Sequence, residues 1–325
     1  MADVSEQELA RRSRAVAPAV AEHLTVTPLR RFAALSTELG VDLLVKCEHL
    51  QRTGSFKARG ALAKLATLTP DERARGVVTA STGNHGLGVA NALATLGGTG
   101  HVFVPDTAQP TKVAALERFG VRVHSLAAEA GAVEIMAREY ADERGLAFVS
   151  PYNDPDVIAG QGTIGVELID QAVRGLDALV VAVGGGGLVS GIAAVLKEDL
   201  PGVRIIGASP SNDAAMALSV HKGQLESIEA KPTLSDGTAG NVEPGSITFE
   251  LCRSLVDEWV LVSEPDIAAA LRSVIDTEHE LVEGSAAVAF AAARAVAPRF
   301  VGGRVGVIAC GRNISSAALV SALSV

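Results

Sequence analysis

The sequence predicts an α/β protein built on doubly wound parallel sheets. Short apolar runs alternate along the chain with longer segments of helical periodicity. The runs are continuously apolar, which is typical of strands buried on both faces of a parallel sheet. With 325 residues, of which 48% are hydrophobic and 20% charged, the chain is long enough for one large domain or two modest ones, and its composition excludes a disordered protein.

The predicted strands are six short apolar runs. They cover residues 43–48, 76–82, 101–105, 178–187, 204–209 and 306–310. Segments of helical periodicity lie between them and are opened or closed by Gly, Pro or a capping residue; examples are residues 61–68, 86–96 and 113–119. This alternation of strand and helix is the order of a doubly wound sheet.

One part of the chain carries a strand–helix series of its own. It runs from Val77 to Val149, and its strands are short and closely spaced. We therefore expect a small domain, residues 76–153, inserted into a large domain formed by residues 1–75 and 154–325.

The charge balance favours a small-molecule role. The chain has 28 basic and 37 acidic residues, a net charge of -9, and no dense stripe of Lys and Arg. These features argue against nucleic acid and an anionic membrane surface as partners. We expect a small-molecule substrate, with no nucleic acid and no membrane involved.

Cysteines and apolar segments predict a cytoplasmic protein. Cys47, Cys252 and Cys310 lie far apart, without the CxxC spacing of a structural zinc site, so a reducing compartment is the simplest interpretation. The N-terminal segment lacks the apolar core of a signal peptide, so no export is expected. Four consecutive glycines interrupt the most apolar stretch, Leu176 to Leu196, so we expect no membrane span.

Three glycine-bearing turns follow predicted strands, at the edge where open α/β sheets bind ligands. The first is GGGGLVSG, from Gly184 to Gly191, ahead of an Ala-rich helix. Successive glycines let backbone N–H groups converge on an anion, and the helix N-terminus favours negative charge, so we expect a phosphate here. The alternative is a tight turn without a ligand.

This phosphate is not expected to belong to a nucleotide. The GxGxxG fingerprint would need its third glycine at Val189 or Ser190, and the Walker-type GxxxxGK motif does not occur. A different phosphorylated ligand is therefore indicated.

The second turn, STGNHG, offers donors for a carboxylate. Ser81, Thr82, Asn84 and His85 stand beside backbone amides at the start of a predicted helix. On its own the pattern is also explained by a simple N-cap, and His85 by a structural histidine.

The third turn, TGSFKARG, contains a lysine among small and apolar residues. Lys57 is flanked by Phe56 and lies close to Gly54, between a predicted strand and a helix. A lysine in an apolar pocket has a lowered pKa and can form a Schiff base with an aldehyde. A solvated surface charge is the alternative.

Seven motifs occur together in the order of a known family. They are KCEHLQRTGSFKARGA, STGNHG, VIAGQGT, VGGGGLVSG, LSDGTAG, LVEGSAA and IACGRN. The ordered set, from about Thr27 to Asn313, resembles the fold type II, pyridoxal-phosphate-dependent serine/threonine dehydratases (threonine ammonia-lyases) and serine racemases. The resemblance implies a tryptophan synthase β-like fold, with pyridoxal 5'-phosphate between two doubly wound parallel-sheet domains.

The resemblance also implies a role for residues of each turn. Lys57 is similar to the lysine that carries the cofactor and removes the substrate's α-proton, with Phe56 against the ring and Asn84 at the ring hydroxyl. Cys310 takes the position that faces the pyridine nitrogen, and Glu283 the acidic position near it. Further cofactor-binding positions are Asn153, Gly184, Gly185, Gly186, Gly187 and Leu188; substrate-binding positions are Ser81, Thr82, Gly83, Asn84 and His85, with Thr82 also an expected catalytic residue.

The predicted chemistry is the β-elimination of water. A thiol at Cys310 would not keep the pyridine protonated as an aspartate would, which favours loss of a β-substituent. The implied reaction converts L-threonine or L-serine to a 2-oxo acid and ammonia. Residues 126–133 contain no arginine that could hold a second substrate carboxylate, which counts against 3-hydroxyaspartate.

Two regions depart from the racemase pattern. Racemases of the family place a serine where this chain has Thr82, whose extra methyl alters the reach of the hydroxyl and counts against racemisation. Ser209 and Ala215 stand where the racemases' divalent-cation loop would carry acidic ligands, which leaves only Asp213 nearby. The metal site is therefore unassigned, and a monovalent cation held by backbone carbonyls is the alternative.

Other functions stay open on the sequence alone. Within the family they are an amino-acid racemase, a threonine synthase-like or other β-replacement enzyme, and a dehydratase for a less common hydroxy amino acid, such as a hydroxyectoine-derived amino acid or 3-hydroxyaspartate. Outside it they are a non-catalytic amino-acid sensor and, more remotely, a Rossmann-type nucleotide binder. The resemblance further implies a homodimer.

Overall fold

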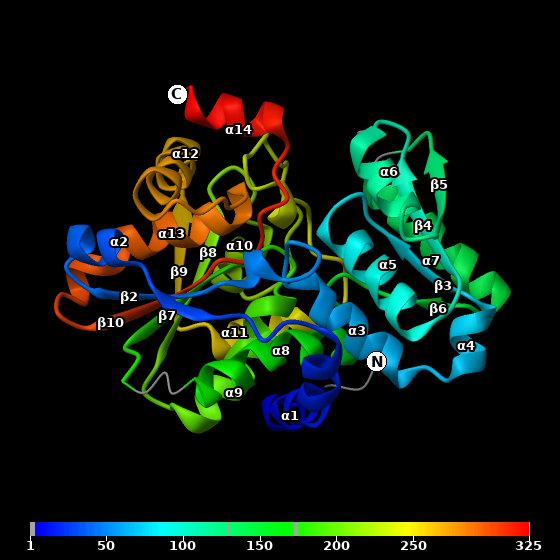
Figure 1. The fold of residues 1–325 in the computed structure, drawn as a ribbon, viewed down its shortest axis with the longest axis horizontal. Helices are drawn as coiled ribbons and strands as arrows, with labels where there is room; N and C mark the ends of the chain where they lie inside the picture. Colours follow the sequence, from blue (N-terminus) through cyan, green and yellow to red (C-terminus); the bar gives the residue numbers. More distant parts are fainter. Residues whose placement is uncertain (1–3, 109, 129, 172–174, 325) are drawn as a thin grey trace.

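The strands form two separate sheets in two lobes. The computed structural model describes residues 4–108, 110–128, 130–171 and 175–324. Within these ranges one sheet has six strands and the other four, and Figure 1 shows the two sheets in lobes that lie side by side. We call the part built on the six-stranded sheet the large lobe and the other part the small lobe. The arrangement confirms the predicted α/β class.

The large sheet has the strand order β1-β2-β10-β7-β8-β9. Neighbouring strands are parallel except β1, which pairs antiparallel with β2 at one edge. This order places β2, from the first part of the chain, directly beside β10, from the last part (Figure 1). The bounds are β1 Leu29–Arg31, β2 Asp42–Lys46, β7 Ala178–Ala182, β8 Arg204–Pro210, β9 Glu258–Val262 and β10 Arg304–Ile308.

The small sheet has the order β5-β4-β3-β6 and is parallel throughout. Its strands are β3 Val77–Ala80, β4 Gly100–Pro105, β5 Arg122–Leu126 and β6 Ala147–Phe148. The helices of the small lobe are α4 Pro70–Arg75, α5 Asn84–Leu96, α6 Pro110–Glu117 and α7 Ala130–Arg144. The whole sheet is thus a compact unit within one continuous stretch of chain.

Helices cover both faces of the large sheet. In Figure 1, α12 and α13 lie on one side of it and α1, α8 and α9 on the other. Among the described residues, no helix combines the length and the apolar content needed to cross a membrane. The bounds are α1 Glu6–His23, α2 Ala33–Leu39, α3 Lys57–Thr67, α8 Pro155–Asp170, α9 Gly187–Asp199, α10 Ala215–Lys222, α11 Ile247–Leu255, α12 Glu264–Ser273, α13 Gly284–Val296 and α14 Ser316–Leu323, with short helical turns at Glu48–Leu50, Asp236–Thr238, Val274–Glu278 and Ala297–Arg299.

Helix α3 connects the lobes. Its apolar residues Ala61 and Leu62 share a buried cluster with Val77 and Val89 of the small lobe, and the helix also packs against α8 of the large lobe. We propose that the domain division at residues 76 and 153 follows the two sheets, with α3 as an element that both domains use.

Most expected elements are present, with shifted ends. Strand β7 ends at Ala182, so the glycines that the prediction included in it form a separate loop. Helix α3 begins at Lys57, whereas the sequence predicted a start at residue 61. The charged Arg59 is buried in the first turn and interrupts the apolar periodicity there, so that turn was not recognised. The sequence did not single out β1 and β9, which are edge strands and mostly partly exposed, so they lack a continuous apolar run.

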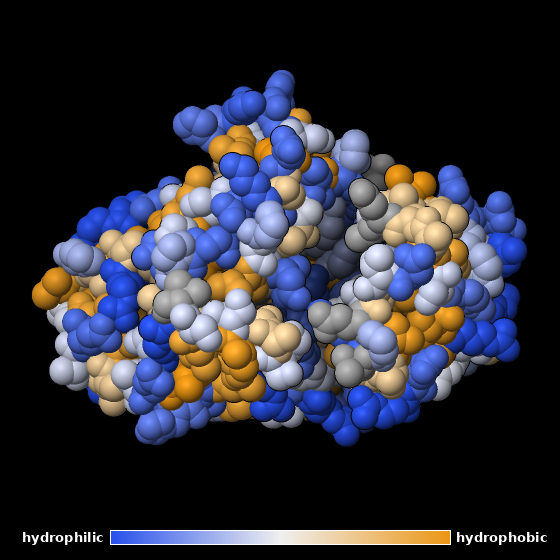
Figure 2. All heavy atoms as spheres, turned by 90° about the horizontal axis from the view of Figure 1, so that it is seen from above, coloured by the Kyte–Doolittle hydropathy of each residue, from blue (hydrophilic) through white to orange (hydrophobic). Residues whose placement is uncertain are grey.

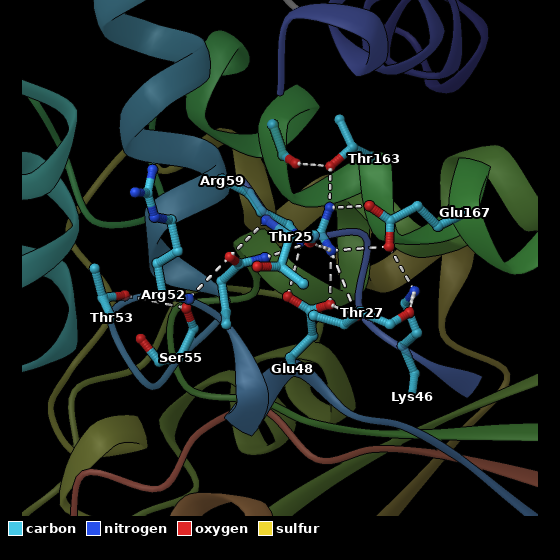
Figure 3. Close-up of polar contacts among 12 residues, drawn as sticks. Thr25, Thr27, Lys46, Glu48, Arg52, Thr53, Ser55, Arg59, Thr163 and Glu167 are labelled. Carbon is cyan, nitrogen blue, oxygen red and sulfur yellow. Dashed lines mark hydrogen bonds and ion pairs between the residues drawn. The ribbon is translucent and has the colours of Figure 1, made fainter. Parts of the chain in front are cut away.

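A buried group of charges fixes the first turn of α3 to the large lobe. The Arg59 guanidinium donates to Glu48, with Nε 2.7 Å from Oε2, and to Glu167, with Nη2 2.9 Å from Oε2 (Figure 3). Lys46 pairs with the same Glu167, and Thr27 donates to Glu48. Every charge in the group therefore has an opposite partner, which a buried charge needs in order to be tolerated.

The lobes face each other across a cleft. Figure 2 shows it as a hollow between two halves, with hydrophilic residues in its depth. In the described part of the chain, two ion pairs join the lobes: Lys112 Nζ lies 3.3 Å from Asp236 Oδ2, and Arg138 Nη2 lies 3.0 Å from Glu243 Oε2. The glycine-bearing turns lie between the lobes, as described next.

Candidate active site

The three turns singled out in the sequence lead into helices whose N-termini gather at the cleft. Lys57 is the first residue of α3, Asn84 the first of α5 and Gly187 the first of α9. The starts of α3 and α5 are in contact, since a Cβ on Gly88 would lie 2.9 Å from the Lys57 carbonyl oxygen. The segment after β6 bridges to the third turn, because Tyr152 packs on Gly185. The structure thus brings the predicted turns together at the cleft.

The Lys57 amine is held without a carboxylate partner. Its Nζ donates to the carbonyl oxygen of Pro151 at 2.8 Å and lies 5.3 Å from the centre of the Phe56 ring. Within the described ranges it forms no ion pair. Burial lowers the pKa of Lys57 to about 8, and the negative groups near it only partly oppose that shift. A substantial neutral fraction near pH 8 makes this amine a nucleophile and a base.

Backbone pairing sets the position of Lys57. Ser55 forms an isolated antiparallel bridge with Gly311, and the Phe56 N–H donates to the carbonyl oxygen of Cys310 at 3.1 Å. The Arg312 N–H donates to Gly54 at 2.9 Å. The segment before α3 is therefore tied to the segment after β10, and Lys57 follows directly.

The tetraglycine loop has no room for side chains. A Cβ on Gly184 would lie 2.6 Å from the Thr238 carbonyl oxygen, and one on Gly185 would lie 2.4 Å from the Tyr152 ring. Gly186 has φ +85°, which favours glycine, and a Cβ there would lie 2.6 Å from Cys252 Sγ. The loop leads into the N-terminus of α9, so its backbone presents N–H groups and the positive end of a helix dipole to an anion.

Asn84 and Glu283 meet across the two lobes. Asn84 Nδ2 donates to both carboxylate oxygens of Glu283, at 2.8 and 3.1 Å. Asn313 joins them: its side-chain amide donates to Asn84 Oδ1 at 2.7 Å, and its backbone N–H donates to Glu283 at 2.9 Å. Burial raises the pKa of Glu283 to about 7 in spite of these donors.

Cys310 is a neutral thiol beside Lys57. It is buried at the end of the segment after β10, and burial raises its pKa well above the ordinary value. The N–H of Phe56, the residue before Lys57, donates to the Cys310 carbonyl oxygen at 3.1 Å, so the two segments lie side by side. An uncharged group at this position is what the sequence predicted.

The STGNHG loop leads into the N-terminus of α5, where no side chain caps the first turn. Ser81 Oγ accepts from the Gly83 N–H at 3.1 Å, and a Cβ on Gly83 would meet no atom within 4 Å, so this face is open. Thr82 beside it is half-buried. His85 is buried, its Nε2 lies 3.0 Å from the Val149 carbonyl oxygen, and burial lowers its pKa to about 3. His85 is thus a neutral ring in the wall.

Asn153 and Leu188 support the site from behind. Asn153 is buried, and its Oδ1 accepts from the Ile247 N–H at 3.0 Å, which caps the start of α11. Leu188 is buried in the core of the large lobe. The contacts of both residues hold the elements around the tetraglycine loop.

Several residues of the cleft were not found by sequence reasoning. They are Tyr152, which covers the tetraglycine loop; Asn313, which orients Asn84; and a group of Glu134, Arg138 and Glu243 at the cleft edge. Asn313 ends the IACGRN motif and Tyr152 follows the last small-lobe strand, so both had a positional signal. The charged group had none, because it joins residues that are far apart in sequence.

The residues at the positions of the racemases' divalent-cation loop form other contacts in this chain. Ser209 Oγ donates to the Val183 carbonyl oxygen at 2.8 Å, and Asp213 Oδ2 accepts from the Gly240 N–H at 2.8 Å. Ala215 begins α10. Among the described residues there is no group of three His, Cys, Asp or Glu side chains able to hold a metal ion.

The site residues fit pyridoxal phosphate. The side-chain-free loop at Gly184–Gly187 can hold its phosphate, Lys57 can bond its aldehyde carbon, and the Cys310 thiol can face its ring nitrogen. When bound, the cofactor supplies an electron sink that makes the substrate's Cα–H bond more acidic. The fold and cleft therefore define an enzyme that activates amino acids with this cofactor.

Comparison with known proteins identifies the family. A family model described as "Pyridoxal-phosphate dependent enzyme" matches residues 20–311, and the chain belongs to this family. It is 41% identical over 269 residues to the L-threonine ammonia-lyase of Thermotoga maritima, covering 82% of this chain but only 66% of that protein.

Two solved structures show the same fold along nearly the whole chain. The processed form of threonine deaminase isoform 2 from Solanum lycopersicum superposes with a TM-score of 0.91 at 33% identity, covering 97% of this chain and 92% of that one. Serine racemase from Dictyostelium discoideum gives 0.87 at 30% identity, with 94% and 98% covered. The sheets described above are therefore those of fold type II enzymes.

Proposed function

We propose that the protein is an ammonia-lyase that removes water from a small 3-hydroxy amino acid, L-threonine or L-serine, to give a 2-oxo acid and ammonia. The observation that carries the proposal is the Lys57 amine, whose pKa is lowered to about 8. It bonds the Pro151 carbonyl oxygen, next to the Tyr152 that packs on the tetraglycine loop, and it forms no ion pair with a carboxylate among the described residues. The threonine ammonia-lyase and threonine deaminase relatives support this choice of reaction.

The chain's own residues divide the work of this reaction. Backbone N–H groups of the STGNHG loop receive the substrate carboxylate at the start of α5. Lys57 takes the proton from the substrate's Cα, because its amine is neutral in part near pH 8. Asn84, held by Asn313 and Glu283, would bond the ring hydroxyl of the cofactor and so help to hold its ring.

A coupled assay tests the proposal. Ammonia and 2-oxo acid are measured with L- and D-serine, L-threonine, L-allothreonine and 3-hydroxyaspartate, for the wild type and Lys57→Ala. We expect turnover of a neutral hydroxy amino acid that disappears in Lys57→Ala. If the holoenzyme acts on none of them, or if Lys57→Ala retains the activity, the proposed reaction is wrong.

Racemisation is the second candidate, because serine racemase shares the fold along 94% of this chain. Its second acid/base would be the half-buried Thr82 at the open face of the STGNHG loop. The test is chiral chromatography of serine after incubation with wild type and Thr82→Val. Loss of D-serine formation in Thr82→Val, with ammonia release retained, would assign this role to Thr82.

The compartment, the oligomeric state and the bound cation are proposals too. We propose a cytoplasmic homodimer that uses a monovalent cation near Asp213, whose Oδ1 is buried without a partner among the described residues. Free buried thiols at Cys47, Cys252 and Cys310 are consistent with a reducing compartment. Sedimentation, and assays in potassium against an organic cation, test the dimer and the ion.

A further inference from the structure

Three residues lead the chain from the small lobe back to the large lobe and contact both the reactive lysine and the tetraglycine loop. Pro151, Tyr152 and Asn153 lie between β6 and α8, and we call them the crossing segment. The Pro151 carbonyl oxygen accepts from Lys57 Nζ at 2.8 Å. Because a carbonyl oxygen only accepts, this bond uses one N–H of the amine and leaves the lone pair of its neutral form free. The crossing segment therefore fixes where the reactive amine lies.

The next residue, Tyr152, forms one wall of the tetraglycine loop. We call this loop, Gly184–Gly187, the phosphate cradle. A Cβ on Gly185 would lie 2.4 Å from the Tyr152 ring, and one on Gly187 would lie 3.1 Å from the Tyr152 Cβ. The ring and backbone of Tyr152 thus fill the space that side chains of the cradle would need. Adjacent residues of the crossing segment therefore hold the amine and the cradle.

The Tyr152 hydroxyl connects the crossing segment to the other side of the cradle. It accepts from the Glu243 N–H at 2.9 Å, just before α11 begins. Thr248 of α11 donates its hydroxyl to the Gly185 carbonyl oxygen at 2.6 Å, and Asn153 caps the start of the same helix. The cradle is therefore held between the Tyr152 ring and α11, and both are bound to the crossing segment.

Buried polar contacts hold the crossing segment itself in place. Ser150 Oγ accepts from the Asn153 N–H at 3.0 Å. The Val149 carbonyl oxygen accepts from Thr79 Oγ1 at 2.9 Å and lies 3.0 Å from His85 Nε2. All five of these residues are buried. The crossing segment can therefore serve as a fixed spacer between the amine and the cradle.

Pyridoxal phosphate needs these two groups at a matching separation, because one ring carries both its aldehyde and its phosphate. The Lys57 nitrogen bonds the aldehyde carbon, and the aldehyde oxygen leaves as water, only if the amine reaches that carbon while the phosphate lies in the cradle. Two binding points on one molecule strengthen each other when their spacing fits the site, and this gain is lost when it does not.

We propose that Tyr152 is a positioning residue that sets the separation between the Lys57 amine and the phosphate cradle to the one that pyridoxal phosphate requires. Tyr152 acts through its neighbours, the Pro151 carbonyl group and the backbone of Gly185. The inference goes beyond the proposed function, because it holds for any reaction that the bound cofactor serves.

The first test compares the whole cofactor with its two parts. Dissociation constants of the cofactor-free full chain are measured for pyridoxal phosphate, for inorganic phosphate as a competitor, and for 5'-deoxypyridoxal, which has the ring and the aldehyde without the phosphate. Tyr152→Phe keeps the ring and loses the hydroxyl, and Tyr152→Ala loses both. Tyr140→Phe and Tyr140→Ala are the matched controls, because Tyr140 packs on Phe103 and His124 within the small lobe.

We expect Tyr152→Ala to weaken binding of pyridoxal phosphate about 100-fold, at least ~10-fold more than the product of its losses with the two parts. Tyr152→Phe should show the same pattern with a loss of about 3- to 10-fold, because one hydrogen bond is removed. The controls should bind all three compounds like the wild type. A loss equal to the product of the two separate losses, or unchanged affinity in both variants, overturns the inference. If Tyr152→Ala does not fold, Tyr152→Phe decides.

Borohydride reduction of the saturated protein gives an independent readout. In the wild type, nearly all of the bound cofactor should become fixed to Lys57. In Tyr152→Ala a share of it should be held by its phosphate alone, keep the absorbance of a free aldehyde and escape fixation. Complete fixation to Lys57 in Tyr152→Ala would show that the separation is unchanged and would overturn the inference. Neither measurement involves turnover of an amino acid, so failure of the proposed ammonia-lyase reaction would leave both results standing.

Discussion

Lys46 and Lys57 are two lysines in neighbouring segments that differ in burial and in hydrogen-bond partners. Lys46 is fully buried and bonds the Glu167 carboxylate, Gln171 and the Thr27 carbonyl oxygen. Lys57 is partly buried, and among the described residues its amine bonds only the carbonyl oxygen of Pro151. Burial lowers the pKa of both, but at Lys46 a bonded carboxylate opposes it.

The difference separates a structural charge from a reactive one. The group around Lys46 holds α3 on the large lobe, because each of its charges has a partner (Figure 3). The amine of Lys57, at the start of the same helix, lacks such a partner and stays reactive. A rigid, fully paired region thus carries an unpaired lysine to the cleft.

The largest expected effect comes from removing the reactive amine. Lys57→Met should reduce kcat at least ~10³-fold, since both the covalent partner of the cofactor and the base are lost. The free energy of unfolding of the cofactor-free protein should stay equal or rise, because an unpaired buried cation is removed. Steady-state kinetics and urea denaturation measure the two quantities. A marked loss of stability with activity retained would mean that Lys57 is a structural charge and not the reactive amine.

The paired region should respond in the opposite way. Glu167→Gln leaves Arg59 and Lys46 with one carboxylate fewer, so we expect a loss of about 3–5 kcal/mol in the free energy of unfolding. The control is Glu250→Gln, which breaks an exposed pair with Arg253 and should cost no more than ~1 kcal/mol. Equal costs in the two variants would show that the buried group is not what holds α3.

The phosphate cradle should be sensitive to a single methyl group. In Gly185→Ala the new Cβ would lie 2.4 Å from the Tyr152 ring, so the ring or the loop must shift. We expect affinity for pyridoxal phosphate to fall by about 10- to 100-fold, measured by equilibrium titration of the cofactor-free protein. Gly202→Ala is the matched control, because a Cβ there would meet no atom within 4 Å. Unchanged affinity in Gly185→Ala would remove the loop from the cofactor site.

The smallest expected effect is a pH dependence of cofactor uptake. The neutral Lys57 amine reacts with the aldehyde, and its pKa is about 8, so its neutral fraction rises about tenfold per pH unit below 8 and levels off above. The rate of uptake by the cofactor-free protein should follow the same curve in stopped-flow absorbance. A rate that keeps rising beyond about pH 9.5 would mean that Lys57 has the pKa of an ordinary lysine.

The sequence predicted the parts of this site that lie on strand–turn–helix units. Lys57, the STGNHG loop and the tetraglycine loop each follow an apolar run, so the edge where they meet could be inferred before their contacts were known. Strands β1 and β9 escaped because edge strands are partly exposed and lose the apolar signal. The ion pair between Arg138 and Glu243 escaped for another reason: the two residues become neighbours only when the lobes come together.

For single residues too, the sequence predicted positions but not the contacts that form between the lobes. Asn84 was expected at the ring hydroxyl, but the sequence could not show that Asn313 and Glu283 hold it from the other lobe. Residues 126–133 contain no arginine, and of these Glu129 lies outside the described residues. Arg138, further along α7, reaches the cleft but is bound to Glu243 and Phe148. Only the fold reveals that this cation is already used.

The comparison of the two lysines can be tested directly by finding which amine holds the cofactor. Sodium borohydride reduces the bond between a lysine and pyridoxal phosphate and makes it permanent, and peptide mapping by mass spectrometry then locates the modified residue. We predict the modification on Lys57 and none on Lys46. A holoenzyme modified at Lys46 or another lysine, with Lys57 unmodified, would contradict the assignment of Lys57 as the reactive amine.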